Sequence, residues 1–208
     1  MTQVRKAIMD DVDAISQMVA LAFASDPAWT YMLGAHHVRE KQAFAAALLI
    51  PRIRRGTAWV SEDRLALAMW DRRDGGLDPD TDVVQHWQRF RSLVGDEIAD
   101  RVDAYDAAVA AAGPAHPYWY LGVLATHPDA QGNGLATLVL QPGLDAARAD
   151  GWDCWLETSV PSNKPFYAKR GFESGHAFEV PHGPMTWWLQ RRHGWQDSAP
   201  SRSVTVVT

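Results

Sequence analysis

The chain has 208 residues, a formal net charge of -5, and a composition that is 47% hydrophobic and 22% charged. These values fit one globular domain and exclude collagenous, disulfide-stapled and wholly disordered chains. The mild negative charge argues against nucleic acid as the main partner, since phosphate neutralisation needs clustered Lys and Arg, and the local run Arg52, Arg54 and Arg55 is interpreted as a solvated helix end. No apolar run reaches membrane-spanning length and the N-terminus has no signal-peptide pattern, so we expect a cytoplasmic protein that does not bind membranes.

The first half of the chain predicts a strand, two helices and a hairpin. Asp10 and Asp11 supply side chains that can cap the first helix, and Asp26-Pro27 is expected to end it. Pro51 is expected to kink or end the second helix, because proline lacks the amide hydrogen that a helix needs. The expected elements are a strand at 4–8, helices at 12–23 and 37–55, and an antiparallel pair of strands at 57–60 and 64–71.

The second half begins with a helical region that is broken near Gly95 and continues with a strand–helix–strand unit. Such a unit implies a parallel pair of strands with a helical crossover. Pro142-Gly143 is expected to interrupt the crossover helix. A short helix, with Pro165 in its first turn and Gly171 after its last, precedes two final strands. The expected elements are helices at 81–112, 135–148 and 163–170, and strands at 118–126, 152–159, 172–180 and 185–190.

Together these elements predict an α/β (α+β) fold, in which a mixed central sheet carries helices on both faces. We expect a single domain at residues 1–195. The stretch 196–208 is rich in Ser, Pro and Arg and is predicted to be a disordered tail.

The loop between the strand at 118–126 and the crossover helix contains Gly132 and Gly134. Two glycines allow a tight turn in which successive N–H groups face one anion. The start of the helix adds unpaired N–H groups and the positive end of the helix dipole. A pyrophosphate is the natural ligand of such a loop. The alternative is a plain left-handed turn before a helix, with no ligand.

Three phosphate-binding motifs can be compared with this loop. A Walker loop requires Gly-Lys-Ser/Thr, which is absent. A dinucleotide fingerprint requires a third glycine where Thr137 stands; because Asp153 does lie about 20 residues beyond the glycine loop, this interpretation is weakened but stays open. Gln131, Gly134 and Ala136 satisfy the pattern Q-x-x-G-x-A, and the loop thereby resembles the coenzyme A loop of the GNAT acetyltransferases.

A second motif extends this resemblance. Leu156-Glu-Thr-Ser159 is followed by Asn163, Pro165-Phe-Tyr167 and Gly171-Phe172, in the order of the closing motif of the GNAT superfamily. Within the superfamily the chain resembles the puromycin N-acetyltransferases of actinomycetes from Val4 to about Arg191, most closely after residue 117. The further stretches that carry this resemblance are Ala22-Phe-Ala-Ser-Asp-Pro27, Trp119-Tyr-Leu, Leu140-Gln-Pro-Gly143 and Glu179-Val-Pro-x-Gly-Pro-x-Thr-Trp187.

The resemblance implies a GNAT fold with acetyl-coenzyme A (acetyl-CoA) as the acyl donor. Its pantetheine arm would bond to the backbone of the strand that ends at Thr126, and its pyrophosphate would lie on the glycine loop. Asn163 is implied to hold coenzyme A, to cap the short helix, or both. The residues implied to bind the cofactor are Leu124, Ala125, Thr126, Gln131, Gly132, Asn133, Gly134, Leu135, Ala136, Thr137 and Asn163.

The resemblance also implies direct attack of an amine on the thioester, without a covalent enzyme intermediate. A backbone N–H near Leu124 would stabilise the developing oxyanion. Tyr167 is the candidate general acid for the departing thiolate, and its alternative role is that of a core aromatic residue. Glu157, at the end of a central strand, is the candidate base for the amine, and its alternative role is that of a structural carboxylate.

The acceptor site is predicted from aromatic side chains, and the chain has 10 tryptophans. Trp29 and Tyr31 lie where this superfamily builds its acceptor pocket, and Trp70 is expected to face the same cleft. Asp26 would attract a substrate with an amino group. Such a pocket fits a small-molecule amine, for example an aminonucleoside or another antibiotic. The histidines show no metal-ligand spacing beyond the adjacent pair His36-His37, so we assign no metal.

Three functions remain for this sequence. The first is acetyl-CoA-dependent N-acetylation of a small-molecule amine, with a role in antibiotic resistance or detoxification. The second is N-terminal acetylation of proteins or peptides, which a shallow open groove would favour. The third is a catalytically silent domain that binds coenzyme A, and the presence of Tyr167 and Glu157 speaks against it. Tryptophans near the C-terminus make a homodimer one oligomeric state to consider.

Overall fold

A computed structural model describes residues 2–35, 37–75, 81–114, 117–195 and 206–207 of the chain. Within this part, the strands form one 8-stranded sheet in the order β6-β7-β5-β4-β3-β2-β1-β8. The pairs β4–β5 and β1–β8 are parallel and the others are antiparallel. The strands are β1 (Val4–Lys6), β2 (Ala58–Ser61), β3 (Ala66–Arg73), β4 (Tyr118–Thr126), β5 (Cys154–Thr158), β6 (Glu173–Glu179), β7 (Met185–Arg191) and β8 (Val206–Val207).

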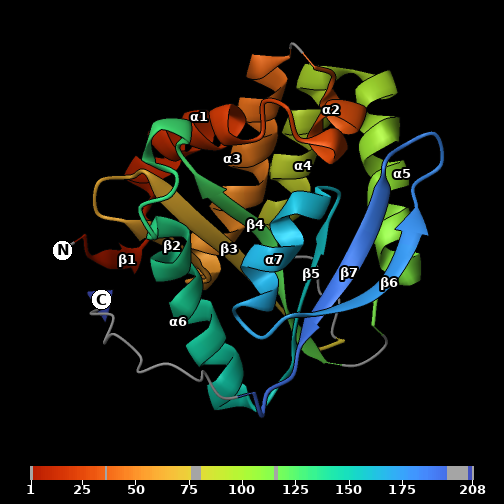
Figure 1. Cartoon of the computed structure of the whole chain (residues 1–208). Helices are drawn as coiled ribbons and strands as arrows, with labels where there is room; N and C mark the ends of the chain where they lie inside the picture. Colours follow the sequence, from red (N-terminus) through yellow and green to blue (C-terminus); the bar gives the residue numbers. More distant parts are fainter. Residues whose placement is uncertain (1, 36, 76–80, 115–116, 196–205, 208) are drawn as a thin grey trace.

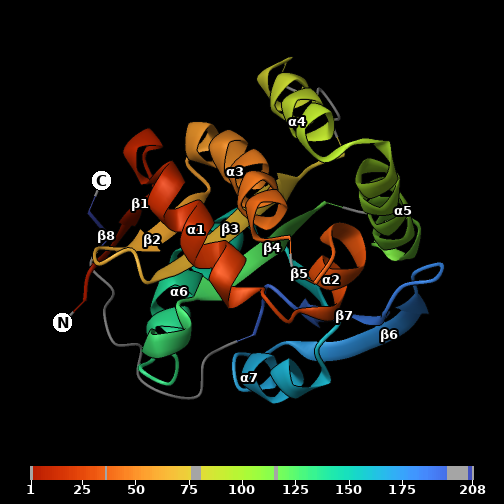
Figure 2. The ribbon, with the colours of Figure 1, turned by 90° about the horizontal axis from the view of Figure 1, so that it is seen from above.

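The helices lie on both faces of this sheet, as expected for a mixed α/β fold (Figure 1). Seen from above, α1 and α3 cover one face and α6 covers the other, while α4 lies beside α3 and α5 lies beside α2 (Figure 2). None of the described helices is both long and apolar enough to cross a membrane. The α-helices are α1 (Val12–Ala22), α2 (Pro27–Leu33), α3 (Val38–Arg55), α4 (Thr81–Val94), α5 (Asp96–Ala112), α6 (Leu135–Asp150) and α7 (Lys164–Ala168).

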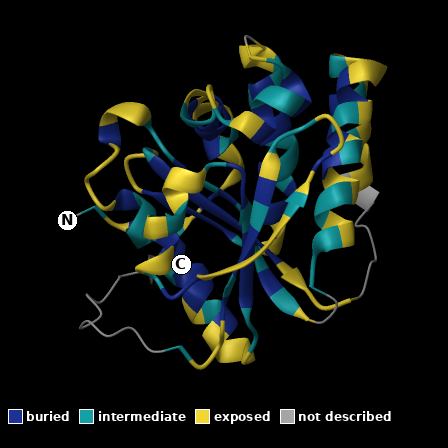
Figure 3. Cartoon of the chain, turned by 45° about the vertical axis from the view of Figure 1, so that its right-hand side comes forward, coloured by how far each residue is buried: buried dark blue, intermediate teal, exposed yellow. Residues whose placement is uncertain are grey.

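The sheet separates two hydrophobic cores, because alternate side chains of a strand point to opposite faces. Leu67 and Met69 of β3 pack in the core under α1 and α3, whereas Ala66, Ala68 and Trp70 pack in the core under α6. The central strands are buried almost throughout, whereas β6, at one edge of the sheet, is largely exposed (Figure 3).

The predicted crossover is confirmed, since β4 and β5 are parallel and α6 connects them. α1 ends at Ala22, before Asp26-Pro27, as predicted, but Asp26 also accepts a hydrogen bond from the Trp29 N–H and begins α2, a helix that the periodicity did not reveal. Pro51 does not end α3, which continues to Arg55. The predicted interruption at Pro142 is wrong, because this proline lies inside an unbroken α6.

The predicted tail at 196–208 falls mostly outside the described residues, which exclude 196–205 and 208. Val206 and Val207 are described, and they form β8, which pairs in parallel with β1.

Gly143 explains how α6 packs closely on the sheet. A Cβ atom at this position would lie 2.2 Å from Nε1 and 2.3 Å from Cε2 of Trp70, which is fully buried on β3. The indole therefore occupies the space that any other residue would need. This contact places Trp70 beneath α6, on the face of the sheet opposite α1 and α3.

We expect Gly143→Ala to destabilise the fold by about 1–3 kcal/mol, the usual cost of overpacking a core. A loss of stability would point to the contact with Trp70, because alanine in a helix interior is normally about 1 kcal/mol more favourable than glycine. Urea unfolding of the wild type, Gly143→Ala, Trp70→Leu and the double variant measures the coupling. If Gly143→Ala cost the same in the Trp70→Leu background as in the wild type, this explanation would be wrong.

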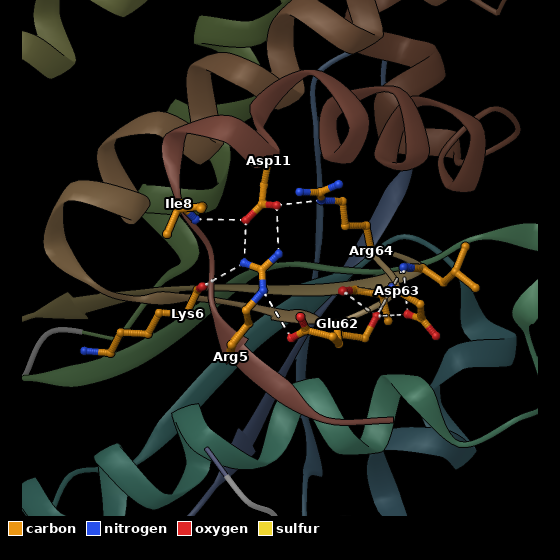
Figure 4. A network of polar contacts seen from close by, with 10 residues as sticks. Arg5, Lys6, Ile8, Asp11, Glu62, Asp63 and Arg64 are labelled. Atoms are coloured by element: carbon orange, nitrogen blue, oxygen red, sulfur yellow. Dashed lines mark hydrogen bonds and ion pairs between the residues drawn. The ribbon is translucent and has the colours of Figure 1, made fainter. Parts of the chain in front are cut away.

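Asp11 is the centre of a polar network that joins the first strand, the first helix and the β2–β3 turn (Figure 4). Its buried carboxylate accepts hydrogen bonds from Arg5 Nη1 at 2.6 Å, Arg5 Nη2 at 2.9 Å, Arg64 Nε at 2.7 Å and the Ile8 N–H at 3.0 Å. It makes no hydrogen bond to the first turn of α1; its capping bond goes to the Ile8 N–H, at the 3-10 turn Met9–Asp11 that leads into α1. Arg64 has a φ of 59°, which is costly for a residue with a side chain, and its bond to Asp11 helps to hold that turn.

The pKa of Asp11 makes this network pH-dependent. Burial alone would raise that pKa, but the hydrogen bonds from Arg5, Ile8 and Arg64 outweigh burial and lower it below its ordinary value. Because the pKa is lower in the folded state, the carboxylate stabilises the fold above its unfolded pKa of about 3.9, and this contribution is lost as the pH falls further.

We expect Asp11→Asn to destabilise the protein by about 3 kcal/mol at pH 7, because it leaves two arginines without their common partner. The loss should shrink as the pH falls below about 4. Urea unfolding between neutral and acidic pH measures both effects. Asp13→Asn, a change at an exposed position of α1, is the control. Equal stability of the two variants at pH 7 would contradict the role given to Asp11.

β4 contains a bulge close to the point where it separates from β5 at the centre of the sheet. Met69 pairs with Val123 and Trp70 pairs with Leu121, so Gly122 has no opposite residue on β3. On the other side, β4 pairs with β5 only at Trp119 and Tyr120. Beyond Tyr120 the two strands therefore diverge, and the β4 backbone that faces β5 has no strand partner.

Candidate active site

Two adjoining cavities lie at the point where β4 and β5 diverge. The first has a volume of about 670 Å³ and is lined by the glycine loop, the end of β4, the end of α1 and the α7 region. The second has a volume of about 390 Å³ and is lined by α2, α3, α5, β4, β5 and Trp188 of β7. Residues that line both cavities are Phe23, Asp26, Leu124, Ser159, Asn163 and Tyr167.

The glycine loop forms an open cradle at the start of α6. Gly132 and Gly134 have φ values of 81° and 79°, a region that favours glycine. A Cβ atom at either position would meet no heavy atom within 4 Å, so the space above the loop is open. No side chain caps the first turn of α6, which leaves the N–H groups of Leu135 and Ala136 available to an anion, whereas the Thr137 N–H donates to the Gly134 carbonyl at 3.1 Å. The loop thus fits a pyrophosphate.

The structure places most of the predicted cofactor residues in the first cavity. Leu124, Ala125 and Thr126 line it from β4, and Asn163 lines it from the turn before α7. Asn133 is not among the lining residues; its side-chain amide donates to the Ala130 carbonyl at 3.2 Å. The Asn163 side chain makes no capping hydrogen bond to α7, which favours the cofactor role over the capping role. The remaining predicted residues that line this cavity are Gln131, Gly132, Gly134, Leu135, Ala136 and Thr137.

Arg170 is a residue of this cavity that sequence reasoning missed. Its guanidinium donates to the Thr137 hydroxyl and, at 2.6 Å, to the Phe166 carbonyl, and it stacks 3.5 Å from the Phe166 ring centroid. It therefore lies against the first turn of α6, next to the glycine cradle, where a positive charge complements a phosphate. Its position after Tyr167-Ala-Lys gives no periodic signal, so only the fold reveals this contact.

The second cavity combines aromatic walls with three carboxylates, those of Asp26, Asp106 and Glu157. Two arginines also line it, but both contact Asp71: Arg52 Nη2 lies 2.5 Å and Arg73 Nη2 lies 3.4 Å from Asp71 Oδ2. Asp71, which also contacts Arg55 at 3.5 Å, offsets part of this positive charge, and the lining itself has three acidic side chains against two basic ones. Its aromatic lining residues are Phe23, Trp29, Phe44, Tyr105, Tyr118, Tyr120, Tyr167 and Trp188.

Of the four predicted substrate residues, two line the second cavity and two do not. Asp26 and Trp29 line the second cavity. Tyr31 lines neither cavity, and its hydroxyl donates to the Pro181 carbonyl at 2.9 Å, which ties α2 to the β6–β7 turn. The prediction for Trp70 is wrong, because its side chain is fully buried beneath α6 on the other face of the sheet. The β4 bulge and the face that each strand residue occupies could not be predicted from the sequence pattern.

Glu157 lies on β5 at the side of the second cavity. Its Oε1 accepts a hydrogen bond from the Tyr120 hydroxyl at 2.8 Å, and its Oε2 is buried without a hydrogen-bond partner among the described residues. Burial disfavours the charged form and raises the pKa of Glu157 to about 7, although the bond from Tyr120 opposes this effect. A carboxylate with such a pKa can accept a proton near neutral pH.

Tyr167 stands between the two cavities. Its ring packs against Phe166 and Phe172, at centroid distances of 5.2 and 5.7 Å. Burial, and secondly the charge of Glu157, raise the pKa of Tyr167 above its ordinary value. The phenol therefore keeps its proton throughout the physiological pH range and is available as a donor. Because the ring also packs in the core, the two roles considered for Tyr167 are compatible.

The sequence profile of the acetyltransferase (GNAT) family matches residues 65–172, which is just over half of the chain. The chain therefore belongs to the GNAT acetyltransferase family and is an acetyl-CoA-dependent N-acetyltransferase by class. The matched region includes β3, β4, the glycine loop, α6, β5 and α7, which supply part of the lining of both cavities.

Solved structures with the same fold cover almost the whole chain. A Corynebacterium glutamicum protein described as histone acetyltransferase HPA2 and related acetyltransferase is similar, with a TM-score of 0.66 and 22% identity over 92% of this chain and 96% of that chain. Arylalkylamine N-acetyltransferase 2 from Aedes aegypti has a TM-score of 0.63 and 11% identity (93% and 99%). A Drosophila melanogaster polyamine N-acetyltransferase has a TM-score of 0.60 and 12% identity (92% and 100%). At these identities the likeness concerns the fold.

Proposed function

We propose that this protein transfers the acetyl group of acetyl-CoA directly to the amine of a small molecule, and that residues 1–195 form its one catalytic domain. The observation that carries the proposal is the junction of the two cavities at Leu124 and Tyr167. A thioester entering from the first cavity and an amine entering from the second would meet there, which gives the proximity that a direct transfer requires.

The cofactor would be held by the residues that line the first cavity. The loop from Gln131 to Thr137 would bind the pyrophosphate, with Arg170 beside it, through N–H groups other than those of Gln131 and Thr137, which donate to the Pro128 and Gly134 carbonyls. The β4 backbone at Leu124 and Thr126, which has no partner on β5, would bond to the pantetheine arm in place of a neighbouring strand. Acetyl-CoA supplies the activated acetyl group, and the protein supplies the groups that orient the thioester and move the protons.

Three residues would carry the chemistry. As the C–N bond forms, Glu157 takes a proton from the amine nitrogen, directly or through one water. The N–H of Leu124 or of a neighbouring residue stabilises the negative charge that grows on the carbonyl oxygen. As the C–S bond breaks, the Tyr167 hydroxyl hydrogen-bonds the departing sulfur and gives it a proton. The products are an N-acetylated amine and free coenzyme A.

The acceptor is an amine that carries an aromatic group. This assignment rests on the rings that surround the second cavity and on the carboxylates of Asp26, Asp106 and Glu157, which favour a protonated amine during binding. An aminonucleoside antibiotic, as the resemblance to puromycin N-acetyltransferases implies, has this chemistry. The polyamine and arylalkylamine acceptors in the names of two structural neighbours define the other amines to compare.

A direct assay tests this proposal. Purified protein, acetyl-CoA and a panel of amines are mixed, and release of coenzyme A is followed with a thiol reagent. The panel contains puromycin, an arylalkylamine, a polyamine and a peptide with a free N-terminus. We expect the highest kcat/KM with an amine that carries an aromatic group. Preference for the peptide would support N-terminal acetylation instead, and cofactor binding without thiol release from any amine would indicate a silent domain.

A further inference from the structure

Tyr120 occupies a special position in the sheet. It is the last residue of β4 that pairs with β5, opposite Trp155, and the strands diverge directly after it. Its hydroxyl reaches across the start of this opening and donates to Glu157 Oε1 at 2.8 Å. Tyr120 belongs to the stretch Trp119-Tyr-Leu, which is part of the family resemblance, but the sequence assigned it no role in the site.

Several contacts fix the Tyr120 ring in this place. The ring packs on Trp188 at a centroid distance of 6.0 Å, and the Arg73 guanidinium lies over its other side at 5.2 Å. A Cβ atom at Gly122 would lie 3.2 Å from Tyr120 Cε1, so the glycine at the bulge leaves room for the ring. The donor is thereby preorganised, because little rotational freedom remains to be lost when it binds the carboxylate.

Glu157 depends on this donor. Its other oxygen, Oε2, is buried and has no partner among the described residues, so the anion lacks the solvation that water would give. Asp106 on α5 adds a repulsive negative charge, whereas Arg73 on β3 adds an attractive positive one. The Tyr120 hydroxyl therefore donates the side-chain hydrogen bond that favours the charged form of the Glu157 carboxylate.

We propose that Tyr120 is a positioning residue that holds Glu157 in the ionised form and orients it to accept the proton of the amine. This inference rests on the proposed role of Glu157 as the base. Burial, followed by the charge of Glu157, raises the pKa of Tyr120 well above its ordinary value, so the phenol stays a donor at every pH at which the enzyme works. Tyr120 makes no bond to the reacting atoms itself.

The other titratable groups around Glu157 define the controls. Tyr118 lies on the same face of β4, Tyr105 lies on α5 and Tyr167 lies on α7, and each interacts with the charge of Glu157. Tyr118 also lines the second cavity, but no hydrogen bond between its hydroxyl and Glu157 is present in the described structure. Tyr118→Phe is therefore the matched control for Tyr120→Phe, because both changes remove one phenolic oxygen from the same wall.

The test is the pH dependence of kcat/KM, measured with an acceptor amine whose own pKa is below about 6 so that the amine does not titrate. We expect Tyr120→Phe to move the acidic limb, which lies near pH 7 in the wild type, upward by about one pH unit. At pH 6 the rate then falls about tenfold further, and at high pH much of it returns. Tyr118→Phe should leave the limb in place, whatever its effect on KM. Thermal unfolding verifies that both variants are folded.

A second readout does not require activity. The carboxyl carbon of Glu157 is titrated by NMR in protein labelled with ¹³C-glutamate, and Glu157→Gln assigns its signal. An unchanged Glu157 pKa in Tyr120→Phe, or an equal shift in Tyr118→Phe, would overturn the inference. If Glu157→Gln keeps the wild-type rate, the proposed base is wrong, while the NMR titration still decides whether Tyr120 controls the ionisation of Glu157.

Discussion

Tyr167→Phe should lower kcat by about 100-fold or more, because general acid catalysis commonly contributes 10²–10⁴-fold. The change removes one oxygen and keeps the ring that packs between Phe166 and Phe172. Without the phenol, the sulfur must leave as a thiolate that Tyr167 can no longer protonate. Steady-state kinetics with the best amine of the panel measures this loss.

The binding of the cofactor separates this role from a structural one. Calorimetry should give nearly the same Kd for coenzyme A in the wild type and in Tyr167→Phe, since the cradle lies at the start of α6. Phe166→Leu, which alters a neighbouring aromatic side chain without removing a proton donor, is the matched control and should lower kcat much less. Equal losses of kcat in the two variants would show that Tyr167 acts through packing alone.

Glu157→Gln should lower kcat/KM by about 100-fold above pH 7 and remove the acidic limb of the pH profile. The wild-type rate should fall on the acidic side of the profile because burial raises the pKa of Glu157 to about 7. The base accepts a proton only when it is ionised, so the wild-type rate falls tenfold for each pH unit below 7. Glutamine has no such titration, and its residual rate should be flat when the amine itself does not titrate.

Stability provides an independent check of the same residue. The pKa of Glu157 is higher in the folded protein than its ordinary value of 4.5, so ionisation of the carboxyl costs stability as the pH rises through this interval toward 7. We therefore expect Glu157→Gln to be as stable as the wild type at pH 8, or more stable. A large loss of stability at pH 8 would indicate a structural carboxylate, and a retained pH limb would assign the base to another group.

The two cavities of the candidate site differ in the charge of the groups that line them. The first presents backbone N–H groups and Arg170 to an anion, whereas the second presents carboxylates to a cation. Under the proposed function, the two substrates would be sorted by charge before they meet at Tyr167. The contact of Arg52 and Arg73 with Asp71 would support this division, because it offsets part of the positive charge that would repel a protonated amine.

Local chemistry was sufficient to predict much of this protein from its sequence. The strand at Tyr118–Thr126, the helical break near Gly95 and the parallel crossover were all predicted, since each depends on hydrophobic periodicity or on a glycine. The glycine loop and the motif that ends at Phe172 were sufficient to identify the superfamily. These signals are local, because neighbouring residues determine turn geometry and helix starts directly.

Only the tertiary structure decided what lies in the site. Pro51 and Pro142 continue their helices, which tertiary packing holds despite the lost hydrogen bonds, and Asp11 binds two arginines in addition to its capping bond. Trp70 lies under α6, although its residue type suited an acceptor pocket. The pairing of Tyr120 with Glu157 joins residues 37 positions apart at the edge of a diverging strand pair. Such contacts depend on the bulge at Gly122 and on which face each side chain occupies, and residue spacing along the chain does not determine them.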